Sequence, residues 1–207
     1  MKRGTRIDEI GFKIINELSN NPRMTINELS KKTKISRPTV TARLKALTDA
    51  GLFDCEAGLS LKNLGFVTAI VSLEAKREQD RISAEEHLAE CPRVHSIFRS
   101  PSKANIQCLV WAENDHTLTS CIGSLRNLEG VNIVSVDYLG TPTKGDIIIK
   151  APHPQPGRVM CKTHHYEHPV EQCQEYVNGL CMGCPATRNY RYTLMMGGEA
   201  PAPAQRD

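Results

Sequence analysis

Apolar residues recur at helical spacing near the start of the chain. In the segment IDEIGFKIINEL they fall at Ile7, Ile10, Ile14, Ile15 and Leu18, and the segment NNPR then interrupts the pattern. One apolar stripe of this spacing, followed by Asn and Pro, predicts a first amphipathic helix that ends near residue 20.

The next thirty residues contain the signals of two more helices. Thr25, with Glu28 three residues later, has the pattern of a capping box in front of a short second helix. After the short turn KIS, Ser36 can cap a third helix over RPTVTARLKALTDAG, with Pro38 in its first turn and Gly51 at its end. This arrangement predicts a helix-turn-helix, whose third helix enters the DNA major groove by its N-terminal half.

Charge supports this interpretation, because Lys and Arg outnumber Asp and Glu in residues 1–50 although the net charge of the whole chain is only +3. An ordinary three-helix bundle with solvated basic residues is the alternative. The side chains expected to contact bases or phosphates of double-stranded DNA are Lys34, Ser36, Arg37, Thr39, Thr41, Arg43 and Lys45.

Residues 66–150 alternate strand-like and helix-like patterns. FVTAIVSLEA, RVHSIFRS, ANIQCLVWAE and VNIVSVDYLG have the composition of strands, whereas SAEEHLAECP and DHTLTSCIGSLRNLEG have helical patterns. The resulting order β-α-β-β-α-β predicts a ferredoxin-like sandwich with two helices on one face of an antiparallel sheet. The segment DIIIK can add one more strand, and the fold class is therefore α+β.

Residues 7–53 resemble the winged helix-turn-helix of the Lrp/AsnC family of prokaryotic and archaeal regulators, through Ile7-Asp8 and the segments INELSKKTKIS and VTARLKALTDAGL. The resemblance implies a winged DNA-binding domain over residues 1–60 and a recognition helix at about 36–49. The core residues that it implies are Leu29, Val40, Leu44 and Leu47.

The β-α-β-β-α-β order at residues 64–150 resembles the second domain of the same family. In relatives this domain mediates dimers and higher assemblies and often binds amino acids between subunits. A homodimer or higher homo-oligomer is therefore expected, and paired operator half-sites require one mechanically.

The hairpin segment RSPSKAN departs from the family pattern, because relatives commonly have a glycine-aspartate turn there. Arg99, Ser100, Ser102 and Lys103 could still bind an anion, with a plain exposed turn as the alternative. The sequence therefore does not predict an amino-acid effector.

The chain has eight cysteines in two distributions. Its N-terminus and hydropathy lack the pattern of a signal peptide or of a membrane span, so a cytoplasmic protein without disulfides is expected. Four cysteines lie scattered among apolar neighbours and are expected to be buried: Cys55, Cys91, Cys108 and Cys121. The other four fall in residues 158–193, between a Pro-rich linker at 151–157 and a Gly/Ala/Pro tail at 194–207 that is expected to be disordered.

This C-terminal segment is too short to fold on a hydrophobic core alone, but it has metal-ligand spacing. Cys161 and His164 form one pair with two residues between them, and Cys181 and Cys184 form another. Two such pairs can provide four ligands of one tetrahedral site, and Cys173 can replace His164. Zinc, copper(I) and an iron–sulfur cluster all suit these ligands.

The same segment resembles the TRASH domain, a short metal-binding module of archaeal metal-handling regulators, through its early cysteine, the middle YVNG and the late CMGCP. The resemblance implies a sensor of a thiophilic metal, with copper as first choice. Two alternatives remain: an iron–sulfur redox sensor, and a structural zinc tail on a regulator with a different effector. The sequence has no nucleophile motif, phosphate loop or acid–base pair, so an enzyme is not expected.

Overall fold

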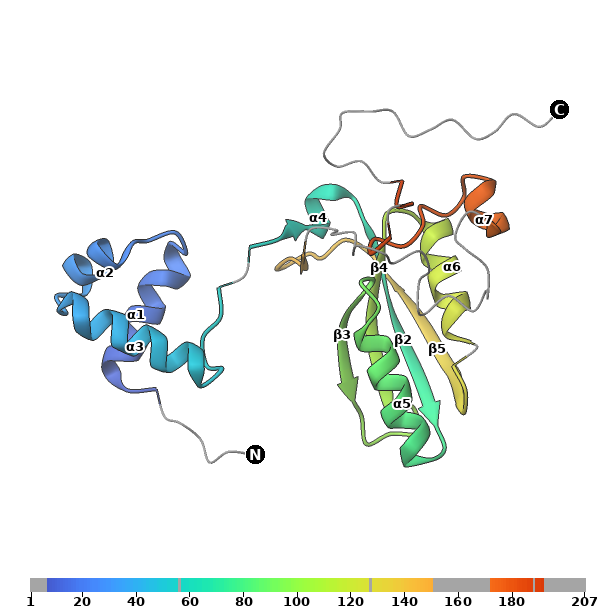
Figure 1. Cartoon of the computed structure of the whole chain (residues 1–207), viewed down its shortest axis with the longest axis horizontal. Coiled ribbons are helices and arrows are strands. Elements are labelled where there is room, and N and C mark those ends of the chain that lie inside the picture. Colours follow the sequence, from blue (N-terminus) through green and yellow to red (C-terminus); the bar gives the residue numbers. More distant parts are fainter. Residues whose placement is uncertain (1–6, 56, 127, 151–171, 188, 192–207) are drawn as a thin grey trace. The chain divides into compact units, whose positions relative to one another are not determined.

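The computed structural model describes residues 7–55, 57–126, 128–150, 172–187 and 189–191 (Figure 1). The predicted linker at 151–157, the tail at 194–207, and the predicted ligands Cys161 and His164 lie outside these residues. The chain divides into two compact units, Met1–Ala57 and Gly58–Asp207. No helix among the described residues is long and apolar enough to cross a membrane.

The first unit has three helices, as predicted: α1 (Glu9–Asn20), α2 (Ile26–Thr33) and α3 (Arg37–Asp49). The capping box is confirmed, because Thr25 accepts the backbone N–H of Glu28 and the Glu28 carboxylate accepts the backbone N–H of Thr25 at 2.7 Å. Ser36 caps α3 as predicted, with Pro38 in the first turn. Between α2 and α3, Lys34 adopts a left-handed conformation with φ of 58°, which closes the tight turn of the motif.

The core of this unit is built from Ile14, Leu18, Leu29 and Val40, which are all buried. Leu47 is also buried and Leu44 is partly buried, in agreement with the predicted core. Two expectations were wrong. Ile7 precedes the N-cap Asp8 and is 41% exposed, and Cys55 lies beyond the end of α3 and is exposed.

The second unit has the predicted β-α-β-β-α-β order. Its elements are β2 (Val67–Ala75), α5 (Glu78–Ala89), β3 (Val94–Arg99), β4 (Ile106–Ala112), α6 (Asp115–Leu125) and β5 (Val131–Leu139). The sheet is antiparallel with strand order β3-β4-β2-β5, and a register shift interrupts the β2–β5 pairing after Ser72. This topology confirms the ferredoxin-like prediction.

The two helices α5 and α6 lie on the same face of the sheet (Figure 1), where alternate residues of the central strands form the core. Val71 of β2 and Cys108 of β4 are fully buried in it, as is Leu88 of α5. The opposite face carries the intervening residues, including Ile70 and Leu109, which are directly paired in the ladder. This alternation is the period of a strand, and it leaves an apolar second face.

A two-stranded sheet stands where the second unit begins. β1 (Leu59–Ser60) pairs with β6 (Ile148–Ile149), so the segment DIIIK does form a strand, of two residues. The short helix α4 (Leu61–Leu64) follows β1. Among the described residues after α3, β1 is the first strand, and it lies within the second unit.

Candidate functional site

Most of the predicted DNA-contacting side chains are exposed on α3 and on the turn before it. Lys34, Ser36, Arg37, Thr41 and Lys45 are exposed. Val40 and Leu47 hold the opposite side of the helix in the core, so the exposed residues of α3 face away from it. The sequence thus leaves most of the predicted residues accessible on the helix-turn-helix.

Four of the predicted residues have partners within the unit. Arg43 forms an ion pair at 2.8 Å with Asp8, whose other carboxylate oxygen accepts the backbone N–H of Gly11 as the cap of α1. Lys45 pairs with Asp49 one turn later at 2.8 Å, and Thr39 is hydrogen-bonded to the Ser36 hydroxyl. These ion pairs are exposed and are therefore weak enough to exchange for phosphate contacts.

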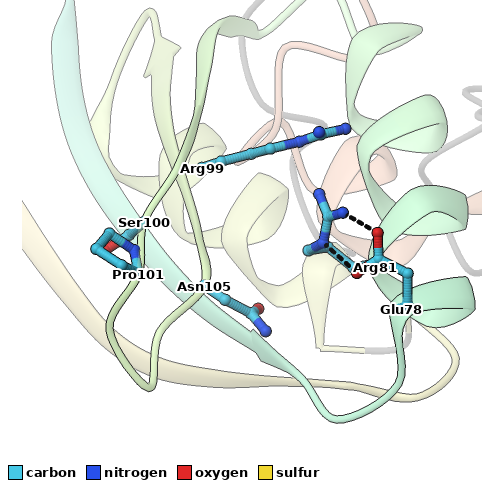
Figure 2. A pocket seen from close by; sticks show the side chains of 6 residues that line it. All are labelled: Glu78, Arg81, Arg99, Ser100, Pro101 and Asn105. Atoms are coloured by element: carbon cyan, nitrogen blue, oxygen red, sulfur yellow. Dashed lines mark hydrogen bonds and ion pairs between the residues drawn. The ribbon is translucent and has the colours of Figure 1, made fainter.

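A pocket of about 410 Å³ lies between α5 and the hairpin that joins β3 to β4 (Figure 2). Arg81 donates to Glu78 and Glu85, and Arg99 donates to Glu85 at 2.6 Å, so neither guanidinium charge is free of a carboxylate. The hydrogen bond from Arg99 is the main reason why the pKa of Glu85 is lowered. The pocket is lined by Glu78, Arg81, Arg99, Ser100, Pro101 and Asn105, so Arg99 and Ser100 of the predicted anion group line it, whereas Ser102 and Lys103 do not.

The described part of the C-terminal segment contains three of the predicted metal ligands. Cys173, Cys181 and Cys184 are all buried thiols. Gly183 has φ of 81°, a conformation that suits glycine, and its backbone N–H donates to Sγ of Cys181 at 3.4 Å. A backbone N–H directed at a cysteine sulfur is the kind of outer interaction that orients metal-bound thiolates.

The thiols are not gathered into a complete ligand set. No group of three or more His, Cys, Asp or Glu side chains in the described ranges is arranged to hold a metal ion. Burial raises the pKa of the Cys181 thiol, while the Gly183 N–H and the positive charge of Arg93 act in the opposite direction. Cys173 is close enough to Cys181 to interact with it electrostatically.

The cysteine turn, defined here as Cys181–Cys184, is attached to the ferredoxin-like domain by specific hydrogen bonds. Arg93 donates to the Gly183 carbonyl at 2.6 Å, and the Met182 N–H donates to Oγ1 of Thr117 on α6 at 3.1 Å. The Tyr190 hydroxyl donates to Glu113. Figure 1 shows the segment that includes α7 (Gln174–Val177) beside α6.

Sequence reasoning missed Arg93, because the residue was counted as the start of a predicted strand. The structure buries it and pairs it at 2.7 Å with Glu113, whose side chain is only 1% exposed. Burial alone would lower the pKa of Arg93, but the neighbouring Glu113 carboxylate holds that pKa above its ordinary value. The only signal in the sequence was an arginine beside apolar strand residues, which does not reveal a buried ion pair.

Residues 7–53 match the family of winged helix-turn-helix DNA-binding domains. A regulator named HTH-type transcriptional regulator LrpA, from Pyrococcus horikoshii, is 27% identical over 130 residues, which are 62% of this chain and 92% of that protein. More than a third of this chain therefore lies outside that match.

Two solved structures show the same fold. Escherichia coli AsnC aligns with a TM-score of 0.57 at 23% identity, over 68% of this chain and 97% of that one. The transcriptional regulator NMB0573 of Neisseria meningitidis, in its complex with L-Met, aligns with a TM-score of 0.60 at 23% identity, over 70% of this chain and 96% of that one. The matched DNA-binding domain, the regulator that matches along most of its length and the shared fold together support an Lrp/AsnC-type helix-turn-helix transcriptional regulator.

Proposed function

We propose that this DNA-binding regulator responds to a thiophilic metal through its C-terminal cysteines. The observation that carries the proposal is the cysteine turn, in which a glycine of positive φ directs its N–H at Cys181 while Cys184 and Cys173 are buried nearby. Cys161, Cys181 and Cys184 would hold the ion, with His164 or Cys173 as the fourth ligand. Both copper(I) and zinc accept thiolate ligands, and copper is the first choice because the resemblance to the TRASH domain implies it.

The residues present fit such an ion chemically. Three buried thiols in a segment this short serve no large apolar core, since the cluster around Cys184 contains only Ala186 among the described buried residues. A bound metal would supply folding free energy to residues 158–193 by linking cysteines far apart in the segment. The chain's own contribution is to orient the Cys181 sulfur with the Gly183 N–H and to exclude water around it.

The DNA contacts are proposed for the N-terminal half of α3. Arg37 and Thr41 are exposed there, and Arg37 has no ion pair among the described contacts. Arg43 would exchange its ion pair with Asp8 for a contact with DNA. A bidentate contact from Arg37 to a base is worth about 1–3 kcal/mol. Arg37→Ala should weaken operator binding in a mobility-shift assay, and Arg126→Ala, which removes the same charge from the second unit, should not.

We also propose a homodimer or higher assembly through the sheet face that α5 and α6 leave open. Phe98 pairs with Gln107 in the ladder and lies on that face beside Ile70 and Leu109, and it is 58% exposed. Exposed aromatic and aliphatic side chains on a paired antiparallel sheet are typical of an interface between subunits. A two-fold dimer would present two α3 helices to two half-sites.

A different effector is the second candidate, because the fold neighbour NMB0573 was solved as a complex with L-Met. The pocket beside Arg81 and Arg99 is the place for an amino acid, and the cysteine segment would then hold structural zinc or an iron–sulfur cluster. The carboxylates of Glu78 and Glu85 disfavour an amino-acid effector in this pocket, because the carboxylate of an amino acid would compete with them for Arg81 and Arg99.

The experiment uses full-length protein purified without added metal, with elemental analysis, an absorption spectrum and operator affinity measured before and after titration with copper(I) or zinc. Cys181→Ser should remove the metal and the metal-dependent change in DNA affinity, whereas Cys55→Ser, at an exposed cysteine of the first unit, should keep both. Full metal content in Cys181→Ser would refute the ligand set. Visible charge-transfer bands would favour the iron–sulfur alternative, and metal loss without any effect on DNA affinity would make the site structural.

A further inference from the structure

The guanidinium of Arg93 joins the cysteine turn to the interior of the second unit. One of its nitrogens donates to the Gly183 carbonyl, and another donates to Glu113. Its cationic group also lies 5.3 Å from the Trp111 ring centroid and 5.9 Å from that of Tyr190. A buried guanidinium with two hydrogen-bonded partners and two aromatic neighbours has one favoured position, because each displacement breaks a contact.

Trp111 connects this position to the segment through which the chain enters the second unit. Its ring stacks on Phe66 with 5.5 Å between the centroids, and its indole N–H donates to the Pro92 carbonyl at 3.1 Å. Trp111 also forms a buried cluster with Leu61 of α4 and Ile149 of β6. We call this group the entry cluster. It consists of the buried Leu61, Trp111 and Ile149 and the partly buried Leu59, Phe66 and Ile147, and Leu59 belongs to the strand β1.

The entry cluster is the first structure of the second unit after the DNA-binding unit ends at Ala57, since β1 begins at Leu59. Leu59 pairs with Ile149, the Leu61 N–H donates to the Ile147 carbonyl at 3.0 Å, and His95 is hydrogen-bonded to the Ile148 carbonyl at 3.2 Å. Trp111 is therefore linked to β1 through packed side chains and ladder hydrogen bonds.

We propose that Arg93 is a positioning residue that couples the conformation of the cysteine turn, through Trp111 and the entry cluster, to the strand that receives the chain from the DNA-binding unit. The inference rests on the proposed function, because a metal bound at Cys181 and Cys184 is what would change the turn. It adds the route by which that change reaches β1, the first strand after the DNA-binding unit. The coupling requires the metal to bind the two conformations of the turn with different affinity.

Trp111 is the only tryptophan in the sequence, so its fluorescence reports on the entry cluster without labelling. Full-length wild type is titrated with zinc, and metal content, Trp111 emission and operator affinity are measured on the same samples. The expected result is a shift in emission with a change in operator affinity of at least about fivefold. The double variant Arg93→Met/Glu113→Gln avoids an unpaired buried carboxylate. It should bind the same amount of zinc as the wild type, but zinc should change its operator affinity by less than about twofold.

Two further variants control this comparison. Thr117→Val removes the acceptor of the Met182 N–H and leaves the Arg93–Glu113 pair in place. It should reduce the changes in Trp111 emission and operator affinity that zinc causes. Arg126→Met removes an exposed arginine of the second unit that lies in neither proposed site, and it should respond like the wild type. A full response of the Arg93→Met/Glu113→Gln variant with normal zinc content would overturn the inference while leaving metal sensing intact.

A metal-independent arm separates the two proposals. In Gly183→Ala the new Cβ would lie 3.0 Å from the Asn189 carbonyl at a φ of 81°, so the substitution strains the turn. Gly183→Ala should change Trp111 emission in the wild-type background and not in the Arg93→Met/Glu113→Gln background. Gly123→Ala on α6, where a Cβ meets open space, is the control. A wild type that takes up neither copper(I) nor zinc would refute the proposed function alone, whereas unchanged emission in Gly183→Ala would refute the coupling.

Discussion

Replacing Arg93 by methionine should destabilise the second unit strongly, and the structure sets the size of the effect. Arg93 is 5% exposed, and the side chain of its partner Glu113 is 1% exposed, so the substitution leaves a carboxylate buried without its counter-charge. Breaking a buried ion pair from one side costs about 3–5 kcal/mol. The Gly183 carbonyl also loses its donor, although such losses within one network are not additive.

The assay is urea denaturation followed by far-UV circular dichroism, which does not depend on Trp111. With a slope of about 1–3 kcal/mol per molar urea, a loss of about 3 kcal/mol lowers the midpoint by roughly 1–3 M. Glu113→Gln added to Arg93→Met should recover much of the loss, because the neutral amide no longer needs a counter-charge. A loss below about 1 kcal/mol for the single variant, or a double variant as unstable as the sum of both singles, would refute this account of the pair.

Three other predictions concern local structure. Leu29→Ala, at a side chain that is 1% exposed, should cost the first unit about 2–5 kcal/mol in thermal unfolding, and a cost below about 1 kcal/mol would contradict its place in the core. Thr25→Ala should cost about 1 kcal/mol by the same measurement, since the capping box loses its side-chain acceptor, whereas Thr41→Ala on the exposed side of α3 should cost little. Phe98→Asp should lower the oligomeric state in sedimentation, and an unchanged sedimentation coefficient would exclude that sheet face as the interface.

Local signals predicted the DNA-binding unit well. The Thr25–Glu28 capping box and the Ser36 cap depend on residues three apart, so the sequence alone contains all the partners. The start of α5 was harder: the pattern indicated a helix only from Ser83, whereas it begins at Glu78. Its first turns are polar on most sides and are held by ion pairs such as Arg81–Glu78, which periodicity does not detect.

Long-range partners could not be predicted. Leu59 pairs with Ile149, ninety positions later, in strands of two residues that carry no periodic signal of their own. The Arg93–Glu113 pair and its contact with Gly183 likewise join three distant segments through single side chains. The metal ligands stay a prediction, since Cys161 and His164 lie outside the described residues and only the spacing of the cysteines indicates their role.

The burial of Cys108 has a chemical consequence for a chain with so many cysteines. Its sulfur is fully enclosed between β2 and α6, and burial raises the pKa of the thiol to about 12. At pH 7 the thiol therefore stays protonated, whereas the thiolate is the form that oxidants and electrophiles attack. The sulfur is also shielded from collision with them, so Cys108 is chemically silent in the folded protein. Oxidative damage to the central sheet would therefore require the domain to open first, and its rate would report the frequency of that opening.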